Sequence, residues 1–515
     1  MTDLAWRLFL FVKDSTGRGE HCFYQFEDGR LVETEAQKVV EFPGVVVCHD
    51  FWSMRDVLFD KTGTLPNVIV DLDEFRMSIS GDPQDRLARE KSDITAVLDR
   101  YGADQEVCAY YKRMLNKGAT FESGVAAKAA QALALMYLDL VECAKAAGEE
   151  DRFFKVEVPV YRLLQGAMAS GILINRSRLS EMRAEVEYEY FVLLKAYSAK
   201  HDMPLETPTK FALEKKLRAE GFDLDDVSID YLLEYVPHEH DFGGETRALQ
   251  AADNARRVLG SLTLSTAVMR PVVDVFGSRT SRIQLRSPAL QSIPKKYREI
   301  IMARDGYELS YVDYDQYEVG VMAALSEDSE LMGLYAAGDM YELFASAHLG
   351  LFQNRKAAKQ LFLSYAYGMS KKALVDAAVA LGVDRTRAKS AFGVFRQYEA
   401  WKRSIWTEFQ SKGSVATLLG NRYVRNGSGQ LSPKEQRSAI SQVVQGTASL
   451  IFKKALLEVG KLDDVSIILP MHDALLFEHK DADAPSKVVY AFERAMTTTL
   501  AGKVAGKASI GSFIS

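Results

Sequence analysis

Alternating apolar and polar positions divide the chain into regions of different secondary structure. Residues 1–115 hold short β-rich runs such as "VVEFPGVVVCH" and "NVIVDL" between helical pieces, a pattern typical of an α/β module. Residues 121–148 are rich in alanine and leucine. They predict a long helix that ends at Gly148, because glycine readily adopts the left-handed conformation found after a helix C-terminus.

The pattern changes again in the rest of the chain. Residues from about 176 to 270 are helical and densely charged, as expected of a solvated helical hairpin. Residues 282–325 are strand-like, residues 327–410 are helical, and residues 464–478 predict a strand, a turn and a second strand. A long helical segment therefore separates two strand-like segments.

Both strand-like segments carry acidic residues. "SYVDYDQYEVGVMAALS" holds Asp313, Asp315 and Glu318 among apolar neighbours, although an unpaired charge in a buried strand costs several kcal/mol. In "IILPMHDALLFE", His472 and Asp473 lie between two apolar runs, a position suited to the tip of a tight hairpin. A His-Asp pair in a turn is more often structural than catalytic, so this short motif needs support from other residues.

The helical segment between them contains "NRKAAKQLFLSYAYGMS". Arg355, Lys359, Leu363 and Tyr367 recur every four residues and therefore share one helix face. Two cations one turn apart repel each other, so this helix face is destabilising unless an anion lies against it. A solvated basic face would explain the cations alone, whereas the whole stripe suits a ligand with phosphate at one side and a flat base at the other.

Composition narrows the class of protein. The chain has 515 residues, enough for roughly three domains, with 47% hydrophobic and 26% charged residues as in soluble globular proteins. Its net charge of −6 excludes a general polyanion binder, so a nucleic-acid partner would need a local basic groove. No apolar run approaches the roughly 20 residues of a membrane span. Four cysteines without a CxxC spacing indicate free thiols in a reducing, cytoplasmic compartment.

Divalent metal ions offer one explanation for the acidic residues. Asp313 and Asp473, if brought together, would repel each other unless such ions bind between them. Two Mg²⁺ ions roughly 4 Å apart can activate an attacking oxygen and stabilise a leaving phosphate, and Mn²⁺ can substitute for them. The residues therefore favour phosphoryl transfer, which depends mainly on positioning and charge stabilisation.

Three motifs together resemble family A (polymerase I-like) DNA polymerases. "VDYDQYEVGVMAALS" resembles motif A of that family, "RKAAKQLFLSYAYGMS" resembles motif B, and "MHDALLFE" resembles motif C. Further similar segments follow the family's order: residues 156–175, 281–294, 415–422 and 435–456. The resemblance covers about residues 155–515, and so many co-linear motifs are hard to obtain by chance.

The resemblance implies an α/β multidomain fold, in which a right-hand polymerase follows an RNase H-like, exonuclease-type α/β domain. We expect the exonuclease-like domain at residues 1–150 and the polymerase domain at residues 151–515. Within the polymerase domain the expected parts are a thumb at about 176–270, a palm at about 271–326 and 427–515, and fingers at about 327–426.

The same resemblance assigns roles to the motif residues. Asp313 and Asp473 would ligate two metal ions, with the Tyr314 carbonyl on one of them. Arg355 and Lys359 would hold the triphosphate, and Lys359 would also protonate the departing pyrophosphate. Asp315 is expected to face away from the site, either solvated or salt-bridged.

The remaining roles concern the nucleotide and the DNA. Glu318 would block a ribose 2′-OH, Gln316 would support the triphosphate site, and Tyr367 would pack near the base. The minor groove and the primer terminus would be contacted by Arg282, Gln445 and His472.

Three positions depart from the family pattern. Leu363 stands where an aromatic residue usually faces the sugar. Tyr341 replaces a histidine at the triphosphate, and Gly320 replaces an arginine.

The N-terminal region resembles the exonuclease motifs but lacks their carboxylates. Met54 falls at the aspartate of the second motif, and Lys128 and Ala132 fall at the tyrosine and aspartate of the third. We therefore expect a degenerate domain without 3′–5′ exonuclease activity, and no 5′-nuclease domain in the chain. A displaced site is the alternative, and its candidate ligands are Asp50, Asp56, Asp71 and Asp73.

These observations predict a template-directed DNA polymerase that extends a primer with dNTPs on primer-template DNA and lacks proofreading. A processivity or replisome partner is left open, and no membrane association is expected. A single-subunit RNA polymerase is the nearest alternative, and Glu318 argues against it. A non-catalytic nucleic-acid scaffold is another, and the intact pair of Asp313 and Asp473 argues against that. A phosphate-binding protein with accidental motifs is the third alternative.

Overall fold

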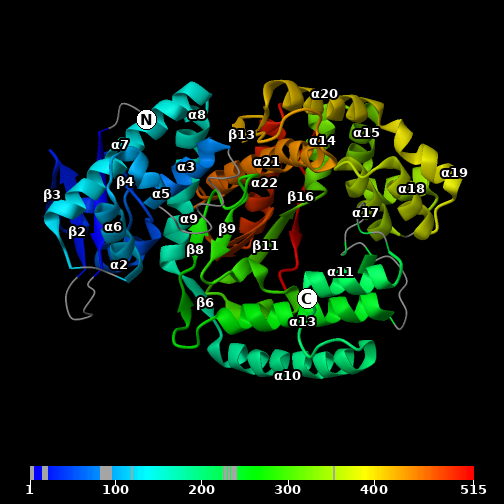
Figure 1. The fold of residues 1–515 in the computed structure, drawn as a ribbon, viewed down its shortest axis with the longest axis horizontal. Helices are drawn as coiled ribbons and strands as arrows, with labels where there is room; N and C mark the ends of the chain where they lie inside the picture. Colours follow the sequence, from blue (N-terminus) through cyan, green and yellow to red (C-terminus); the bar gives the residue numbers. More distant parts are fainter. Residues whose placement is uncertain are drawn as a thin grey trace.

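The computed structural model describes residues 5–13, 21–81, 95–117, 120–222, 241–351 and 354–514, together with residues 224, 229, 232 and 233. Figure 1 shows an α/β unit at the N-terminal end, a central sheet, a group of helices on the far side of that sheet and a layer of long helices beside it. This arrangement agrees with the order of regions that the hydrophobic pattern predicts.

The N-terminal unit is a five-stranded sheet with strand order β3-β2-β1-β4-β5. Strands β1 to β3 are antiparallel, whereas β1, β4 and β5 are parallel. The strands are β1 (Trp6–Val12), β2 (Cys22–Glu27), β3 (Arg30–Thr34), β4 (Val45–Cys48) and β5 (Val68–Asp71). The helices are α1 (Ala36–Val40), α2 (Trp52–Thr62), α3 (Leu72–Ser80), α5 (Thr95–Leu98), α6 (Gln105–Lys117) and α7 (Ser123–Ala147). The α/β module expected from the sequence is confirmed.

The long helix α7 ends where its sequence predicts, because Gly148 has a φ of 68° and accepts the left-handed C-cap conformation. Among the residues that the structure describes, α7 is the one helix long and apolar enough to cross a membrane. Half of its most apolar stretch is buried inside the protein, where the helix packs on α3, α6 and the sheet. Such burial is typical of a core helix.

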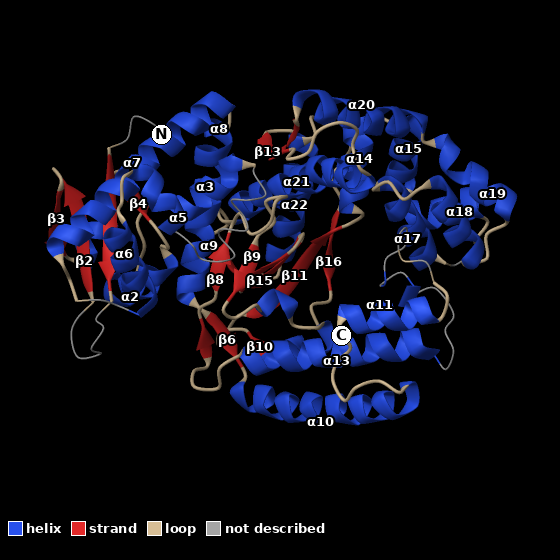
Figure 2. Cartoon of the chain, viewed as in Figure 1, coloured by secondary structure: helices blue, strands red, loops and turns tan. Residues whose placement is uncertain are grey.

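The central sheet has the strand order β14-β15-β11-β16, and its neighbouring strands are antiparallel. Its strands are β11 (Glu308–Tyr314), β14 (Val465–Met471), β15 (Ala474–His479) and β16 (Ala508–Gly511). Helices α21 (Pro433–Val459) and α22 (Ala484–Thr499) pack against each other, and α22 contacts β11 and β16. Figure 2 shows these strands in the middle of the molecule, between helical regions.

Two groups of helices flank the central sheet (Figure 1). One group is α10 (Arg176–His201), α11 (Lys210–Ala219) and α13 (Phe242–Ser261), of which α10 and α13 pack along each other. The other group is α14 (Tyr317–Ser326), α15 (Ser329–Ala337), α16 (Met340–Phe344), α17 (Arg355–Ala366), α18 (Lys371–Ala380), α19 (Arg385–Ser390) and α20 (Arg396–Lys412).

Shorter elements connect these parts. They are α8 (Glu150–Arg152), α9 (Val158–Ser170), β6 (Ile172–Ile174), β7 (Val268–Met269), β8 (Val272–Asp274), β9 (Gln284–Arg286), β10 (Ile301–Met302), β12 (Ser414–Thr417) and β13 (Gly420–Val424).

The sequence predicts a strand-like segment over residues 282–325, and this holds for β9, β10 and β11. It is wrong at Leu290–Ser292 and Lys295–Ile300, which form 3-10 helices, and again after Tyr314. Strand β11 ends there, Gln316 takes a left-handed φ of 51°, and helix α14 begins at Tyr317. Residues 319–324 are buried throughout, and an apolar run buried on all sides does not show whether it is helix or strand. Glu318 therefore lies in the first turn of a helix.

Buried polar contacts join the N-terminal unit to the rest of the chain. Arg55, with 1% of its surface exposed, donates to the carbonyl oxygens of Pro271 at 2.8 Å and Arg270 at 3.1 Å. Below we call this junction the seam. These hydrogen bonds are not readily replaced by hydrogen bonds to water, so they hold the two parts in one arrangement.

We expect Arg55→Met to lower the free energy of unfolding by about 2–4 kcal/mol, because it leaves buried carbonyl groups without a donor. Urea denaturation followed by circular dichroism measures the change. Arg30→Met is the matched control, since Arg30 is exposed on β3, and it should change stability by less than about 0.5 kcal/mol. Equal effects of both substitutions would contradict a structural role for the seam.

Candidate active site

The central sheet brings the two predicted metal ligands together. Asp313 near the end of β11 pairs in register with Ala474, the first residue of β15. Asp473 immediately precedes Ala474 in the turn between β14 and β15, where His472 has a left-handed φ of 58°. The hairpin tip expected for this motif is confirmed, and it places the two acids on adjacent strands.

The electrostatic environment of Asp313 is unfavourable for a free carboxylate. Burial raises its pKa to about 7, with further increases from the charges of Asp473 and Asp315, while Lys359 acts in the opposite direction. Burial also raises the pKa of Asp473. One oxygen of Asp313, Oδ1, is buried and finds no hydrogen-bond donor in the described part of the chain.

These features fit a divalent cation. A buried carboxylate oxygen without a partner, beside a second carboxylate, is a donor set that hard cations such as Mg²⁺ bind. The described residues contain no group of three or more His, Cys, Asp or Glu side chains that could hold a metal ion. Ions bound by Asp313 and Asp473 would therefore need further oxygen ligands from the backbone, from water or from a phosphate.

Asp315 lies outside this pair. Its carboxylate accepts a hydrogen bond from Ser509 Oγ at 2.9 Å, and its backbone N–H donates to the carbonyl of Lys507. The side chain is thus held by the neighbouring strand β16. The sequence predicts a solvated or salt-bridged side chain, whereas the structure shows a hydrogen bond to Ser509 and a charge that raises the pKa of Asp313.

Helix α17 presents the predicted cations, and its N-terminus is capped by Asn354. Arg355 Nε donates to Asp339 Oδ2 at 2.6 Å. Arg355 and Lys359 both lie over the ring of Tyr341, at 5.4 and 5.9 Å from its centroid. The negative face of an aromatic ring attracts cations, so Tyr341 offsets part of their mutual repulsion.

Tyr341 itself is 3% exposed. The sequence analysis places Tyr341 at the triphosphate in place of a histidine, and the structure shows its ring beneath two cations. Asp339, which the sequence analysis missed, accepts from the backbone N–H groups of Tyr341 and Glu342 as a helix N-cap and pairs with Arg355. An aspartate just before a short helix was the available signal.

Gln316 supports the same region. Its side chain donates to the carbonyl of Gly338 at 3.1 Å and accepts from the N–H of Met340 at 2.7 Å. These contacts hold both sides of Asp339. Gln316 therefore acts on the cationic face through the position of Asp339.

Glu318 is held from two sides. Arg282 donates to Glu318 Oε1 at 2.7 Å, and the Tyr367 hydroxyl donates to Oε2. Burial and the negative charge of Glu318 raise the pKa of Tyr367 well above its ordinary value, so the hydroxyl stays protonated and can donate. This contact joins the C-terminal end of α17 to the first turn of α14.

The remaining predicted residues surround this centre. Leu363 is half-buried on α17, His472 is exposed at the hairpin tip, and Gln445 accepts from Ser441 Oγ at 2.9 Å. Gly320 has no space for the arginine of the family pattern, since a Cβ there would lie 2.4 Å from Met496 Cε.

The N-terminal acids have structural partners. Asp71 caps α3 by accepting from Asp73 and Glu74 N–H, Asp73 pairs with Arg76, and Asp56 pairs with Arg55. Met54, at the position of a family aspartate, is buried in the core. Asp50, the fourth candidate, lies 3.9 Å from His49 Nδ1, and its charge adds to burial in raising the pKa of Asp71. The displaced site and the loss of exonuclease activity both stay predictions.

Comparison with known proteins identifies the family. The model of DNA polymerase family A matches residues 252–512, which is just over half of the chain. The chain belongs to DNA polymerase family A.

Curated relatives agree with this assignment. DNA polymerase I of Rhizobium leguminosarum is 28% identical over 238 residues, covering 41% of this chain and 23% of the relative. DNA polymerase I of Mycobacterium tuberculosis (strain ATCC 25618 / H37Rv) is 24% identical over 362 residues, covering 63% of this chain and 40% of the relative. The matched region thus spans less than half the length of these relatives.

A solved structure shows the fold. The polymerase domain of Pol1 from M. smegmatis, in complex with DNA primer-template and dNTP, superposes with a TM-score of 0.75 at 19% identity. The superposition covers 98% of this chain and 94% of that one. The predicted α/β right-hand polymerase fold is confirmed, and the exonuclease-type character of the N-terminal unit stays a prediction.

We expect Asp313→Asn to stabilise the metal-free protein at pH 8 by about 1–3 kcal/mol, less than a fully buried charge would imply. The carboxyl pKa is about 7 in the folded state and near 3.8 when unfolded. Stability is therefore lost as pH rises between these values, and asparagine avoids that loss. Melting temperatures in EDTA from pH 4 to pH 8 measure the difference.

The advantage of the asparagine variant should become small near pH 4, where the carboxyl is protonated in the folded state and about half protonated in the unfolded state. Millimolar Mg²⁺ at pH 8 should raise the melting temperature of the wild type more than that of the variant. Identical pH profiles of the two proteins would contradict the proposed environment of Asp313.

Proposed function

We propose that this family A member is a template-directed DNA polymerase that extends a primer 3′ end with dNTPs by two-metal nucleotidyl transfer. The observation that supports this most is the partnerless, buried oxygen of Asp313 beside Asp473, faced by the cationic side of α17. A phosphate-binding helix opposite an acidic pair is the arrangement that phosphoryl transfer needs.

Each residue of the site has a distinct task in this reaction. Mg²⁺ ions bound by Asp313 and Asp473 would lower the pKa of the primer 3′-OH and stabilise negative charge on the phosphate. Arg355 and Lys359 would hold the triphosphate. The primer 3′-OH would give its proton to water while its oxygen forms a bond to the α-phosphorus. The bond from that phosphorus to the bridging oxygen would break, and Lys359 would give a proton to the departing pyrophosphate.

Glu318 would select the sugar. Its carboxylate is fixed between Arg282 and Tyr367 and cannot rotate freely away from the site. A fixed acid beside the sugar leaves no room for a 2′-OH. This favours deoxynucleotides and argues against the RNA polymerase alternative.

The expected thumb, palm and fingers are part of the proposal. We assign α10, α11 and α13 to the thumb, the central sheet with α21 and α22 to the palm, and α15 to α20 to the fingers. Primer-template DNA would lie against Arg282, Gln445 and His472. We place the enzyme in the cytoplasm and leave a processivity partner open.

Primer extension tests the proposal directly. We expect the wild type to extend a labelled primer with Mg²⁺ and dNTPs, and Asp473→Asn to lose at least about 10³-fold in rate. Asp315→Asn is the matched control from the same acidic segment and should stay within about threefold of wild type. Duplex binding without extension by the wild type would favour the scaffold alternative.

Glu318→Ala should raise the efficiency of ribonucleotide incorporation relative to dNTPs by about 10–100-fold, because it removes the group that excludes the 2′-OH. Single-nucleotide incorporation with paired dNTP and rNTP substrates measures this ratio. An unchanged ratio would show that another residue selects the sugar.

A mismatched primer tests the N-terminal domain. With Mg²⁺ and no nucleotide, we expect the labelled primer to keep its length, because the exonuclease motif positions lack carboxylates. Shortening of the primer by the wild type, and equally by Asp473→Asn, would locate a nuclease site outside the central sheet.

A further inference from the structure

A chain of buried charged and hydroxyl groups connects the seam to the candidate active site. We call it the Glu157 network and define it as Glu149, Arg152, Glu157, Ser281 and Lys453. All of these residues are buried, and Lys453 on α21 is 0% exposed. The proposed roles of the metal ligands and of the triphosphate-binding face do not explain why these charged groups are buried together.

The centre of the network is Glu157. Its Oε1 accepts from Arg152 Nη1 at 2.7 Å, and its Oε2 accepts from Lys453 Nζ. Lys453 also donates to Ser281 Oγ, which in turn lies 3.3 Å from Glu157 Oε1. Both carboxylate oxygens and the ammonium group are therefore satisfied within the protein.

The outer end of the network reaches the N-terminal unit. Arg152 donates to the carbonyl oxygen of Ser78 at 2.6 Å and pairs with Glu149. Glu149 also accepts from the backbone N–H groups of Asn421 at 3.0 Å and Arg422 at 3.3 Å. The network thus joins α3, α8 and β13 to helix α21.

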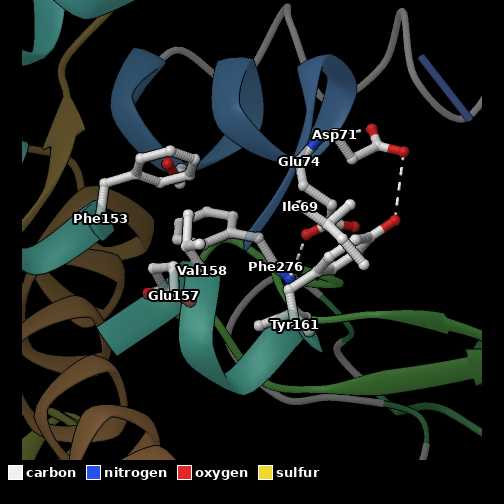
Figure 3. Close-up of a pocket in the computed structure, with 10 residues that line it drawn as sticks. Ile69, Asp71, Glu74, Phe153, Glu157, Val158, Tyr161 and Phe276 are labelled. Atoms are coloured by element: carbon white, nitrogen blue, oxygen red, sulfur yellow. Dashed lines mark hydrogen bonds between the residues drawn. The ribbon is translucent and has the colours of Figure 1, made fainter. Parts of the chain in front are cut away.

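The same seam holds the chain that leads to Ser281. Figure 3 shows Glu74 of α3 accepting from the Phe276 N–H, at 2.7 Å, and Asp71 accepting from the Tyr161 hydroxyl, at 3.1 Å. Glu157 lies in the same close-up. Arg152 and Lys453 lie over the Phe276 ring, at 5.8 and 5.4 Å from its centroid.

The inner end of the network is a constrained loop. Ser281 has a φ of 62°, a conformation that a serine keeps only where its surroundings enforce it. Those surroundings are Lys453 on its hydroxyl and Ser449, which donates to its carbonyl. The next residue is Arg282, whose N–H donates to Ser278 Oγ at 3.1 Å.

Stability alone does not explain the network. Buried ion pairs add little net stability, because the loss of hydration offsets the attraction between the charges. Their geometry is nevertheless specific, since each donor must meet its acceptor. In this network the geometry fixes the backbone direction at Ser281. That direction points the Arg282 side chain toward Glu318, so that Arg282 Nη2 lies 2.7 Å from Glu318 Oε1.

We propose that the Glu157 network is a positioning device for Arg282, which sets its guanidinium for the Glu318 contact and for the base pair at the primer terminus. The inference rests on the proposed function. Lys453 and Glu157 act through Arg282 and touch neither DNA nor nucleotide. The exonuclease-like domain, through Arg152 and the seam, thereby supports nucleotide selection.

A double-mutant cycle in the full-length protein tests this coupling. We expect Lys453→Met and Arg282→Ala each to reduce the rate of single-nucleotide incorporation by about tenfold and to weaken discrimination against rNTPs. In the Arg282→Ala background, Lys453→Met should have almost no further effect on either quantity. Lys454→Met, one residue away on α21 and outside the network, is the matched control and should resemble wild type.

Ser281→Gly provides a second route to the answer, because glycine accepts the left-handed φ without strain but lacks the hydroxyl that Lys453 binds. It should reproduce the loss of rNTP discrimination in a protein that still unfolds in a single cooperative thermal transition. If Lys453→Met does not fold, Ser281→Gly tests the inference by itself.

The inference would be overturned if the effects of Lys453→Met or Ser281→Gly multiply with those of Arg282→Ala. It would also be overturned if Ser281→Gly discriminates against rNTPs as well as the wild type does. These outcomes are distinct from failure of the proposed function, in which the wild type itself extends no primer. That result would overturn both.

Discussion

The mutual repulsion of Asp313 and Asp473 is the constraint on which the site depends. Adjacent antiparallel strands hold the two carboxylates in a partly buried position, where burial already raises both pKa values. Such an arrangement is unfavourable without a positive counter-charge. The Asp313 oxygen that finds no donor among the described residues gives a reason for a bound cation. The cationic face of α17 gives a reason for a bound phosphate.

Several contacts around this pair hold supporting residues and leave the reacting groups accessible. Gln316 and Asp339 locate Arg355, and the Tyr341 ring lies beneath Arg355 and Lys359. Glu318 receives donors from the palm side and from α17. Preorganisation of this kind reduces the reorganisation needed when a substrate binds.

The N-terminal unit has a place in the same scheme. Its segments that resemble exonuclease motifs hold Met54, Lys128 and Ala132 in place of the family residues, and Glu74 and Arg152 make buried contacts with the segment that leads to Arg282. A domain held this tightly can act as a scaffold for the polymerase. Two of its acids serve the fold, since Asp71 caps a helix and Asp73 makes an ion pair.

Much of this protein could be predicted from its sequence alone. Spacings of four placed Arg355, Lys359 and Tyr367 on one helix face, apolar flanks placed Asp473 in a hairpin tip, and the order of motifs indicated the family. These are local patterns, because a helix or hairpin repeats over a few residues. Glu318 was placed in a strand because an apolar run buried on all sides carries no periodic signal.

The tertiary structure alone decided which distant residues meet. The pairing of Asp313 with Ala474, the ring of Tyr341 beneath two cations and the Glu157 network all join segments far apart in the chain. Contacts of this kind depend on how whole elements pack, which no short sequence pattern records. The sequence by itself therefore determined the chemistry that is available, and packing decided which side chains hold it in place.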